Sequence, residues 1–157
     1  MQSKSPAPAS PLIEADRRNS IFCLGRGPAF AISNEAALKF KETCQIHAES
    51  YSSAEVLHGP VSIVDSGFPV IALASHDDAE SALASVADEI AAKGASVFTT
   101  SSKVEKATPL PSTRTGHALT DPITLIASFY AMVERTASSR GINPDAPRHL
   151  KKVTEMV

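Results

Sequence analysis

The sequence predicts an α/β protein, a three-layer sandwich in which a parallel sheet of about four to five strands carries helices on both faces. Two observations favour this fold class. Short runs that are apolar at every position are typical of strands buried in a parallel sheet. These runs alternate with longer segments whose apolar residues recur every three to four positions, as in helices packed on a sheet. The 157 residues, of which 43% are hydrophobic, suffice for one such domain.

The first strand and the first helix are predicted near the N-terminal end of this pattern. Residues 21–24 read Ile-Phe-Cys-Leu, and Gly25-Arg26-Gly27 closes the strand. Pro28 suits the first turn of a helix. A helix from about 28 to 46 is expected because apolar residues recur at every fourth position, namely Ile32, Ala36, Phe40 and Cys44.

A loop, a strand and a second helix are predicted in the middle of the chain. Residues 48–65 are mixed in composition and are expected to form a loop with a short helix near 53–58. Residues 69–74 (PVIALA) are the clearest strand. The next helix starts with Asp77 and Glu80 in the spacing of a capping box and stops at Gly94.

The last third supplies further strands and a long helix. Residues 95–100 predict a strand, residues 107–110 a weaker one, and residues 111–118 a polar loop. Asp121-Pro122 is typical of an N-cap followed by a first-turn proline, and a helix over 122–140 is expected. Its apolar residues cover more than one face, so a single sheet cannot bury them all. They include Leu119, Ile123, Ile126, Tyr130, Val133 and Ala137.

Composition and charge exclude several classes of function. The net charge of −2 makes nucleic acid an unexpected partner, and no apolar run is long enough to predict a membrane partner. Residues 1–18 are rich in Pro, Ser and Ala, which predicts a flexible leader without a secretory signal and hence a cytoplasmic location. No metal or cofactor is expected, because the five histidines lack ligand spacing and Cys23 and Cys44 lie in apolar segments.

Candidate substrate-binding residues lie where the strands end, because ligands of parallel sheets bind at the carboxyl ends of strands. Gly25-Arg26-Gly27 lacks the third glycine of a dinucleotide fingerprint and the lysine of a P-loop. It is either a tight strand-to-helix turn or a place where Gly25 and Arg26 approach a polar substrate at a helix N-terminus. Ser75 and Thr100-Ser101 are expected at the same edge.

Candidate acid–base residues lie on the first helix and after it. Glu35, Lys39 and Glu42 fall at i, i+4 and i+7 and share one helix face. This face is either a solvated surface with ion pairs or a site where a carboxylate acts as general base beside a carbonyl. His58 is either a surface or capping histidine or an acid–base group. Lys152 either belongs to a basic solvated end of the chain or, in a site, forms a Schiff base or holds an anion.

Five runs of sequence, taken in order, resemble the sugar isomerase (SIS) domain, a flavodoxin-like α/β domain. They are LGRG at 24–27, NEAALKFKE at 34–42, IHAESY at 46–51, SAEVLHGP at 53–60 and DAPRHLKK at 145–152. The resemblance covers residues 20–157. It is greatest to the second SIS domain of glutamine–fructose-6-phosphate aminotransferase and to SIS-type glucosamine-6-phosphate deaminases.

The resemblance implies a role for each candidate. Glu42 matches the glutamate that moves a proton between C1 and C2 of the sugar phosphate, and Lys39 and Glu35 match polar residues that line the sugar. His58 matches a histidine of ring opening, which enters from the neighbouring subunit. Lys152 matches a tail lysine that forms an imine with the open-chain ketose. The implied catalytic set is therefore Glu42, His58 and Lys152, each with a side chain suited to its step.

The sequence also departs from these relatives. It contains no N-terminal cysteine nucleophile, no glutaminase domain and no SxSGxT phosphate loop of a first SIS domain. It resembles the second half alone, from a truncated gene or a fragment. The expected organisation is a leader at 1–18, one SIS domain at 19–142 and a tail at 143–157 that closes over the sugar site.

The resulting functional hypothesis is an amino-sugar phosphate isomerase or deaminase with aldose–ketose chemistry on glucosamine 6-phosphate or fructose 6-phosphate. The ligand is thus a hexose or hexosamine 6-phosphate, and the expected partner is a second copy in a homodimer or a separate first SIS domain. Two alternatives stay open, which are a non-catalytic regulatory module that binds sugar phosphate and a truncated remnant without a ligand.

Overall fold

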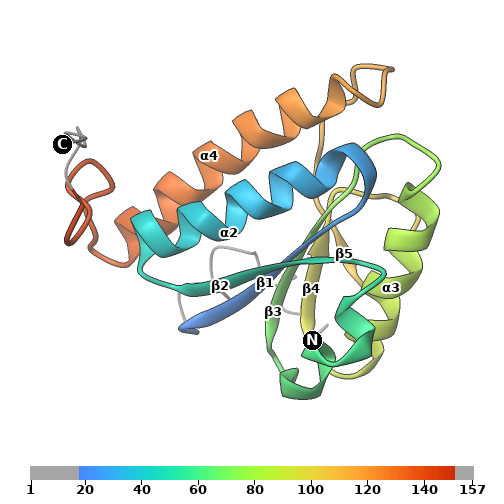
Figure 1. Ribbon diagram of the computed structural model, residues 1–157, viewed down its shortest axis with the longest axis horizontal. Helices are drawn as coiled ribbons and strands as arrows, with labels where there is room; N and C mark the ends of the chain where they lie inside the picture. The colour runs from blue at the N-terminus through green and yellow to red at the C-terminus, as the bar shows by residue number, and fades with distance from the viewer. Residues whose placement is uncertain (1–17, 151–157) are drawn as a thin grey trace, which may run out of the picture.

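A parallel five-stranded sheet forms the middle layer of the protein in the computed structural model, which describes residues 18–150 (Figure 1). The strand order is β2-β1-β3-β4-β5. The strands are β1 (Ser20–Gly25), β2 (His47–Ser52), β3 (Pro69–Leu73), β4 (Ser96–Thr99) and the short β5 (Thr108–Pro109). The predicted leader, up to residue 17, and the predicted Lys152 of the tail lie outside the described residues.

Helices cover both faces of the sheet, so the predicted three-layer α/β fold is confirmed. Helix α2 (Phe30–Cys44) and helix α4 (Asp121–Ser139) lie side by side on one face (Figure 1). Helix α3 (Glu80–Ala92) covers the other face together with the 3-10 turns at Val56–His58 and Pro60–Ile63. No helix among residues 18–150 is both long and apolar enough to cross a membrane.

Strand β1 is apolar at successive positions because both of its faces are buried. Ile21 and Cys23 join the core under α2 and α4, whereas Phe22 and Leu24 join the core under α3. This is the alternation that a central parallel strand requires. The two cores lie on opposite faces of the sheet around β1. Helix α4 packs on helix α2 through an edge-to-face contact between one aromatic ring of each helix.

Strand β2 corrects the prediction of a loop over residues 48–65. His47–Ser52 pairs in parallel with β1 along its whole length. Only Ala48 is buried in this strand, and the other side chains are exposed or half-buried. An edge strand needs neither an apolar run nor a clean alternation, because one of its sides faces solvent. The polar sequence HAESYS therefore does not show the pattern by which a strand is predicted.

Helices α3 and α4 begin differently from the prediction. Asp77 does not cap α3 as part of a capping box. Its side chain instead accepts a hydrogen bond from the backbone N–H of Ala79, and α3 begins at Glu80. Asp121 is the first residue of α4 and not its N-cap, which is Thr120. Cys23 and Cys44 are buried free thiols, as predicted.

Candidate functional site

The predicted charged face of α2 forms a compact chain of ion pairs. Lys39 Nζ lies 2.7 Å from Glu42 Oε2 and 3.7 Å from Glu35 Oε1. Each of the three side chains is about 30% exposed. The hydrogen bond to Glu42 raises the pKa of Lys39 above its ordinary value, although burial acts in the opposite direction. Lys39 therefore stays cationic and holds both carboxylates in place.

Tyr130 of α4 extends this chain, and sequence reasoning missed its role. Its hydroxyl donates a hydrogen bond of 2.8 Å to Glu35 Oε1. The same hydrogen bond, with some desolvation, raises the pKa of Tyr130. In the sequence Tyr130 is one more member of the apolar stripe of α4. Tyr130 reaches Glu35 only because α4 packs on α2, so no local sequence pattern predicts this contact.

Glu42 is not at the carboxyl edge of the sheet. It lies in the last turn of α2, about 18 Å along the helix axis from Phe30, at 1.5 Å per residue. Only the first turn of α2 borders the edge where strand β1 ends. Glu42 therefore lies away from that edge, at the far end of the helix.

His58 and Glu42 are not brought together within one chain. His58 is exposed and lies in the 3-10 turn that follows the carboxyl end of β2. Glu42 precedes the amino end of the same strand, and six residues of strand span about 20 Å. The two predicted catalytic groups thus lie at opposite ends of β2.

Gly25 and Arg26 sit at the junction of β1 and α2. Gly25 is buried, and a Cβ atom there would lie 2.7 Å from the carbonyl oxygen of Ala29 and 2.8 Å from Cα of Phe30. The close approach of helix to strand therefore requires a glycine at this position, with or without a ligand. Arg26 has an extended backbone and is half-buried.

The carboxyl edge of the central strands is filled by an ion-pair cluster around Arg114. The guanidinium donates to the carbonyl oxygens of Ala74 (2.9 Å) and Thr100 (2.8 Å), and it pairs with Glu80 at 3.0 Å. It also lies 3.5 Å from a carboxylate oxygen of Asp121. Because the side chain of Glu80 is only 2% exposed, Arg114 compensates a buried charge.

Asp121 connects the Arg114 cluster to the segments that contain His76 and Thr115. Burial opposes its ionisation, but hydrogen bonds from the backbone N–H of Thr115 and of His76, the Thr115 hydroxyl and the charge of Arg114 outweigh it. Together they lower the pKa of Asp121 to about 2. The carboxylate is therefore ionised at neutral pH.

Three residues predicted at this edge serve the Arg114 cluster or are buried beside it. The Thr100 hydroxyl bonds to the backbone of Ala74, and the Ser101 hydroxyl donates to Glu80 at 2.8 Å. Ser75 is 1% exposed. The cluster thus lies at the carboxyl ends of β3 and β4, beside the β1/β3 switch point where open parallel sheets of this strand order bind ligands. Sequence reasoning missed Arg114, which stands in no motif, and assigned Glu80 to a capping box and not to this cluster.

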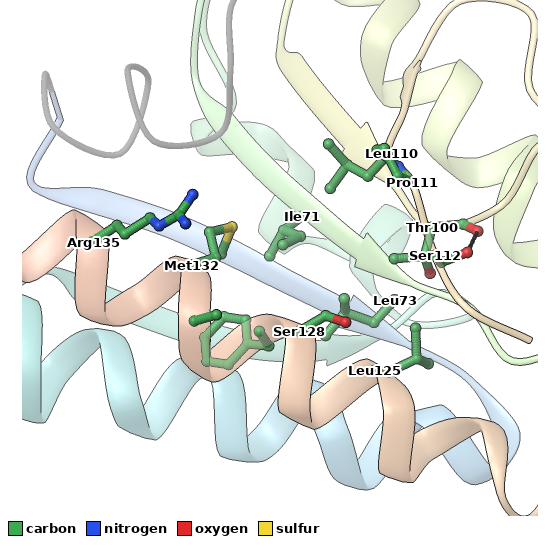
Figure 2. A pocket seen from close by; sticks show the side chains of 12 residues that line it. Ile71, Leu73, Thr100, Leu110, Pro111, Ser112, Leu125, Ser128, Met132 and Arg135 are labelled. Atoms are coloured by element: carbon green, nitrogen blue, oxygen red, sulfur yellow. Dashed lines mark hydrogen bonds between the residues drawn. The ribbon is translucent and has the colours of Figure 1, made fainter.

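An apolar groove of about 490 Å³ lies along the flank of α4 that faces β3 and β4 (Figure 2). Ile71 and Leu73 form part of its floor, and Arg135 and Leu125 mark its two ends on α4. Its described lining contains no carboxylate and no imidazole. Among the described residues, the acid–base candidates therefore lie outside this groove. Among residues 18–150 no group of three His, Cys, Asp or Glu side chains could hold a metal ion.

The parallel order β2-β1-β3-β4-β5 with helices on both faces defines a doubly wound α/β domain. Within that class the SIS domain family model matches residues 15–139, and the chain belongs to the SIS domain family.

Several curated proteins and solved structures are similar to this chain. The chain is 38% identical over 144 residues to a glutamine–fructose-6-phosphate aminotransferase of Pyrobaculum aerophilum, covering 87% of this chain and 23% of that one. A solved structure from Silicibacter pomeroyi DSS-3, provisionally assigned as a phosphosugar isomerase, is 64% identical, with a TM-score of 0.82 over 86% of this chain and 41% of that one.

A second solved structure is the C-terminal domain of glucosamine-fructose-6-phosphate aminotransferase from Francisella tularensis. It has a TM-score of 0.76 at 27% identity and covers 85% of this chain and 40% of that one. The chain thus spans about a quarter of the length of the curated relatives that it matches and less than half of these solved chains.

Proposed function

We propose that this SIS domain belongs to an amino-sugar phosphate isomerase or deaminase that performs aldose–ketose chemistry on glucosamine 6-phosphate or fructose 6-phosphate. The observation that carries the proposal is the contact of 2.7 Å between Lys39 and Glu42 on a half-exposed helix face. A carboxylate with a fixed cationic neighbour is suited to proton transfer beside a carbonyl.

The proposed chemistry is a proton transfer between neighbouring carbons. The Glu42 carboxylate takes the proton from C1 of the open-chain ketose, the C1–H electron pair forms the C1=C2 bond, and the carbonyl electrons move to O2, which takes up a proton to give the enediol. Glu42 then returns its proton to C2 while the O1 hydroxyl loses its proton and becomes the aldehyde oxygen, so the protons balance and no oxidant is consumed. For the amino sugar, Lys152, outside the described residues, is proposed to form an imine with the C2 ketone, with release of water. Ammonia, the nitrogen that a deaminase exchanges with the sugar, then displaces the lysine amine to give the free C2 imine, so Lys152 is regenerated before Glu42 moves the C1 proton to C2.

The proposed site is incomplete in a single chain. The charged face of α2 lies on the surface, and His58 lies at the opposite end of β2. We therefore propose that a second copy or a separate first SIS domain closes the site. That partner would supply the histidine of ring opening and the contacts to the phosphate.

Exchange of the C1 or C2 proton of fructose 6-phosphate or glucosamine 6-phosphate with deuterated solvent tests the proposal. It is measured by NMR on the chain alone and with a first SIS domain supplied. Glu42→Gln should lower the rate by about 10²–10⁴-fold, as expected for loss of a general base. Glu89→Gln is the matched control, because Glu89 forms an exposed pair with Lys93 on α3, which lies on the other face of the sheet.

Equal exchange in the wild type and in Glu42→Gln would show that Glu42 is not the base of the reaction.

A second candidate function, a non-catalytic sugar-phosphate-binding module, is favoured by the separation of Glu42 and His58 in one chain. Calorimetric binding of the sugar phosphate without exchange, even with the partner domain present, would support that second function instead.

A further inference from the structure

We propose that Tyr130 is a positioning residue of the charged face of α2, which holds Glu35 so that Lys39 stays paired with Glu42. This inference rests on the proposed function, because Glu42 is the base assigned there. Nothing in the motif series points to Tyr130, which lies on a different helix.

The distances support an ordered chain of contacts. Tyr130 donates to Glu35 Oε1 at 2.8 Å, and the same oxygen lies 3.7 Å from Lys39 Nζ. Lys39 is much closer to Glu42, at 2.7 Å. Two carboxylates compete for one ammonium, and the one that already accepts a hydrogen bond from a phenol competes less strongly.

The frame that carries Tyr130 is rigid. The neighbouring Phe129 is 3% exposed, and its ring packs edge-to-face on the buried Phe40 of α2 at 5.4 Å. Helix α4 is therefore fixed against the helix that carries Glu35. Tyr130 itself is 44% exposed, so its hydroxyl is held mainly by Glu35 and not by surrounding core.

Removing the Tyr130 hydroxyl frees Glu35 to compete for Lys39. The Lys39 ammonium would then be shared between the two carboxylates, and Glu42 would lose its fixed orientation. Orientation of a catalytic group affects the rate of the chemical step more than the binding of the substrate.

The first arm of the test needs no activity. The chain has two tyrosines, so Tyr51→Phe leaves Tyr130 as the single phenol for a spectrophotometric titration. The pKa of Tyr130 should lie above its ordinary value and should fall when Glu35→Gln is added. Glu89→Gln should leave it unchanged. A pKa of Tyr130 that does not respond to Glu35→Gln would overturn the inference.

The second arm is a double-mutant cycle on proton exchange. Tyr130→Phe should lower kcat roughly 5- to 10-fold, the effect of losing one ordinary hydrogen bond, with KM nearly unchanged. In the Glu35→Gln background, which lacks the competing carboxylate, Tyr130→Phe should lower kcat by no more than about twofold, because the hydroxyl acts only through Glu35. Thermal unfolding of Tyr130→Phe should match the wild type within a few degrees.

The outcomes separate the two proposals. If the wild type shows no exchange with the partner domain present, the proposed function fails and the positioning role fails with it. If the wild type exchanges and the effects of Tyr130→Phe and Glu35→Gln add, the proposed function stands and only the inference about Tyr130 is overturned.

Discussion

Asp121 connects three segments that are far apart in the sequence. Its carboxylate accepts hydrogen bonds from the backbone N–H groups of His76 and Thr115 while it starts helix α4. The side chain is fully buried. A buried carboxylate with several donors is costly to replace, because each donor loses its partner at once.

The stability of the protein should therefore depend on pH through Asp121. Because its pKa is lowered from 3.8 to about 2 on folding, the stabilisation is fully present above about pH 4 and is lost as the pH falls toward 2. Asp121→Asn should lower the free energy of unfolding by roughly 1–3 kcal/mol at pH 6 and by much less near pH 2. Urea unfolding at several pH values measures this.

Asp78→Asn is the control for that experiment, because Asp78 is exposed. It should leave the pH dependence of the wild type intact. A difference between Asp121→Asn and the wild type that does not shrink toward low pH would contradict the assignment.

At the residue scale, the sequence predicted the charged face but not its surroundings. Glu35, Lys39 and Glu42 could be grouped because helical spacing alone brings them together. Tyr130 and Arg114 could not, because each reaches its partner only after helices and loops have packed. Contacts between residues far apart in the chain leave no local pattern.

At the scale of elements, the sequence predicted the tight turn that joins β1 to α2. Gly25→Ala should destabilise the protein by about 1–3 kcal/mol, because the added methyl group meets backbone atoms of α2 that cannot move independently. Thermal unfolding measures the effect. A normal melting temperature combined with lost binding of the sugar phosphate would instead mean that the glycine is needed for the ligand.

Strands β1, β3 and β4 were predictable because both of their faces are buried, which leaves continuous apolar runs. Strand β2 was not, since an edge strand is specified mainly by backbone pairing with its neighbour. Helix α4 was predicted within a residue or two of its observed bounds, but Leu119 lies before it and is 69% exposed.

At the scale of the whole molecule, α4 and α2 expose large apolar side chains on the helical layer that also carries the charged face. Ile123 is 65% exposed and Leu38 is 42% exposed. Together with Tyr130 they lie on the helical layer that also carries Glu35 and Lys39. A surface of this kind is typical of an interface.

The chain should therefore associate with a second copy or with a first SIS domain through this layer. Sedimentation velocity across micromolar concentrations should show the complex, and Ile123→Glu should weaken it at least about tenfold, since a charge would be buried. Ile63→Glu is the matched control, because Ile63 is 57% exposed and lies in a turn on the other face of the sheet. A clean monomer under all of these conditions would contradict the prediction.

The guanidinium of Arg114 is a planar cation that the chain supplies to its own sheet edge. Arg114→Ala would leave an empty space walled by the carbonyl oxygens of Ala74 and Thr100 and by the carboxylate of Glu80. Those groups match a small free cation of the same shape. Millimolar methylguanidinium should therefore raise the melting temperature of Arg114→Ala and leave that of the wild type unchanged. The stability of this variant would then be set by the concentration of an added ligand that binds where the arginine side chain had been.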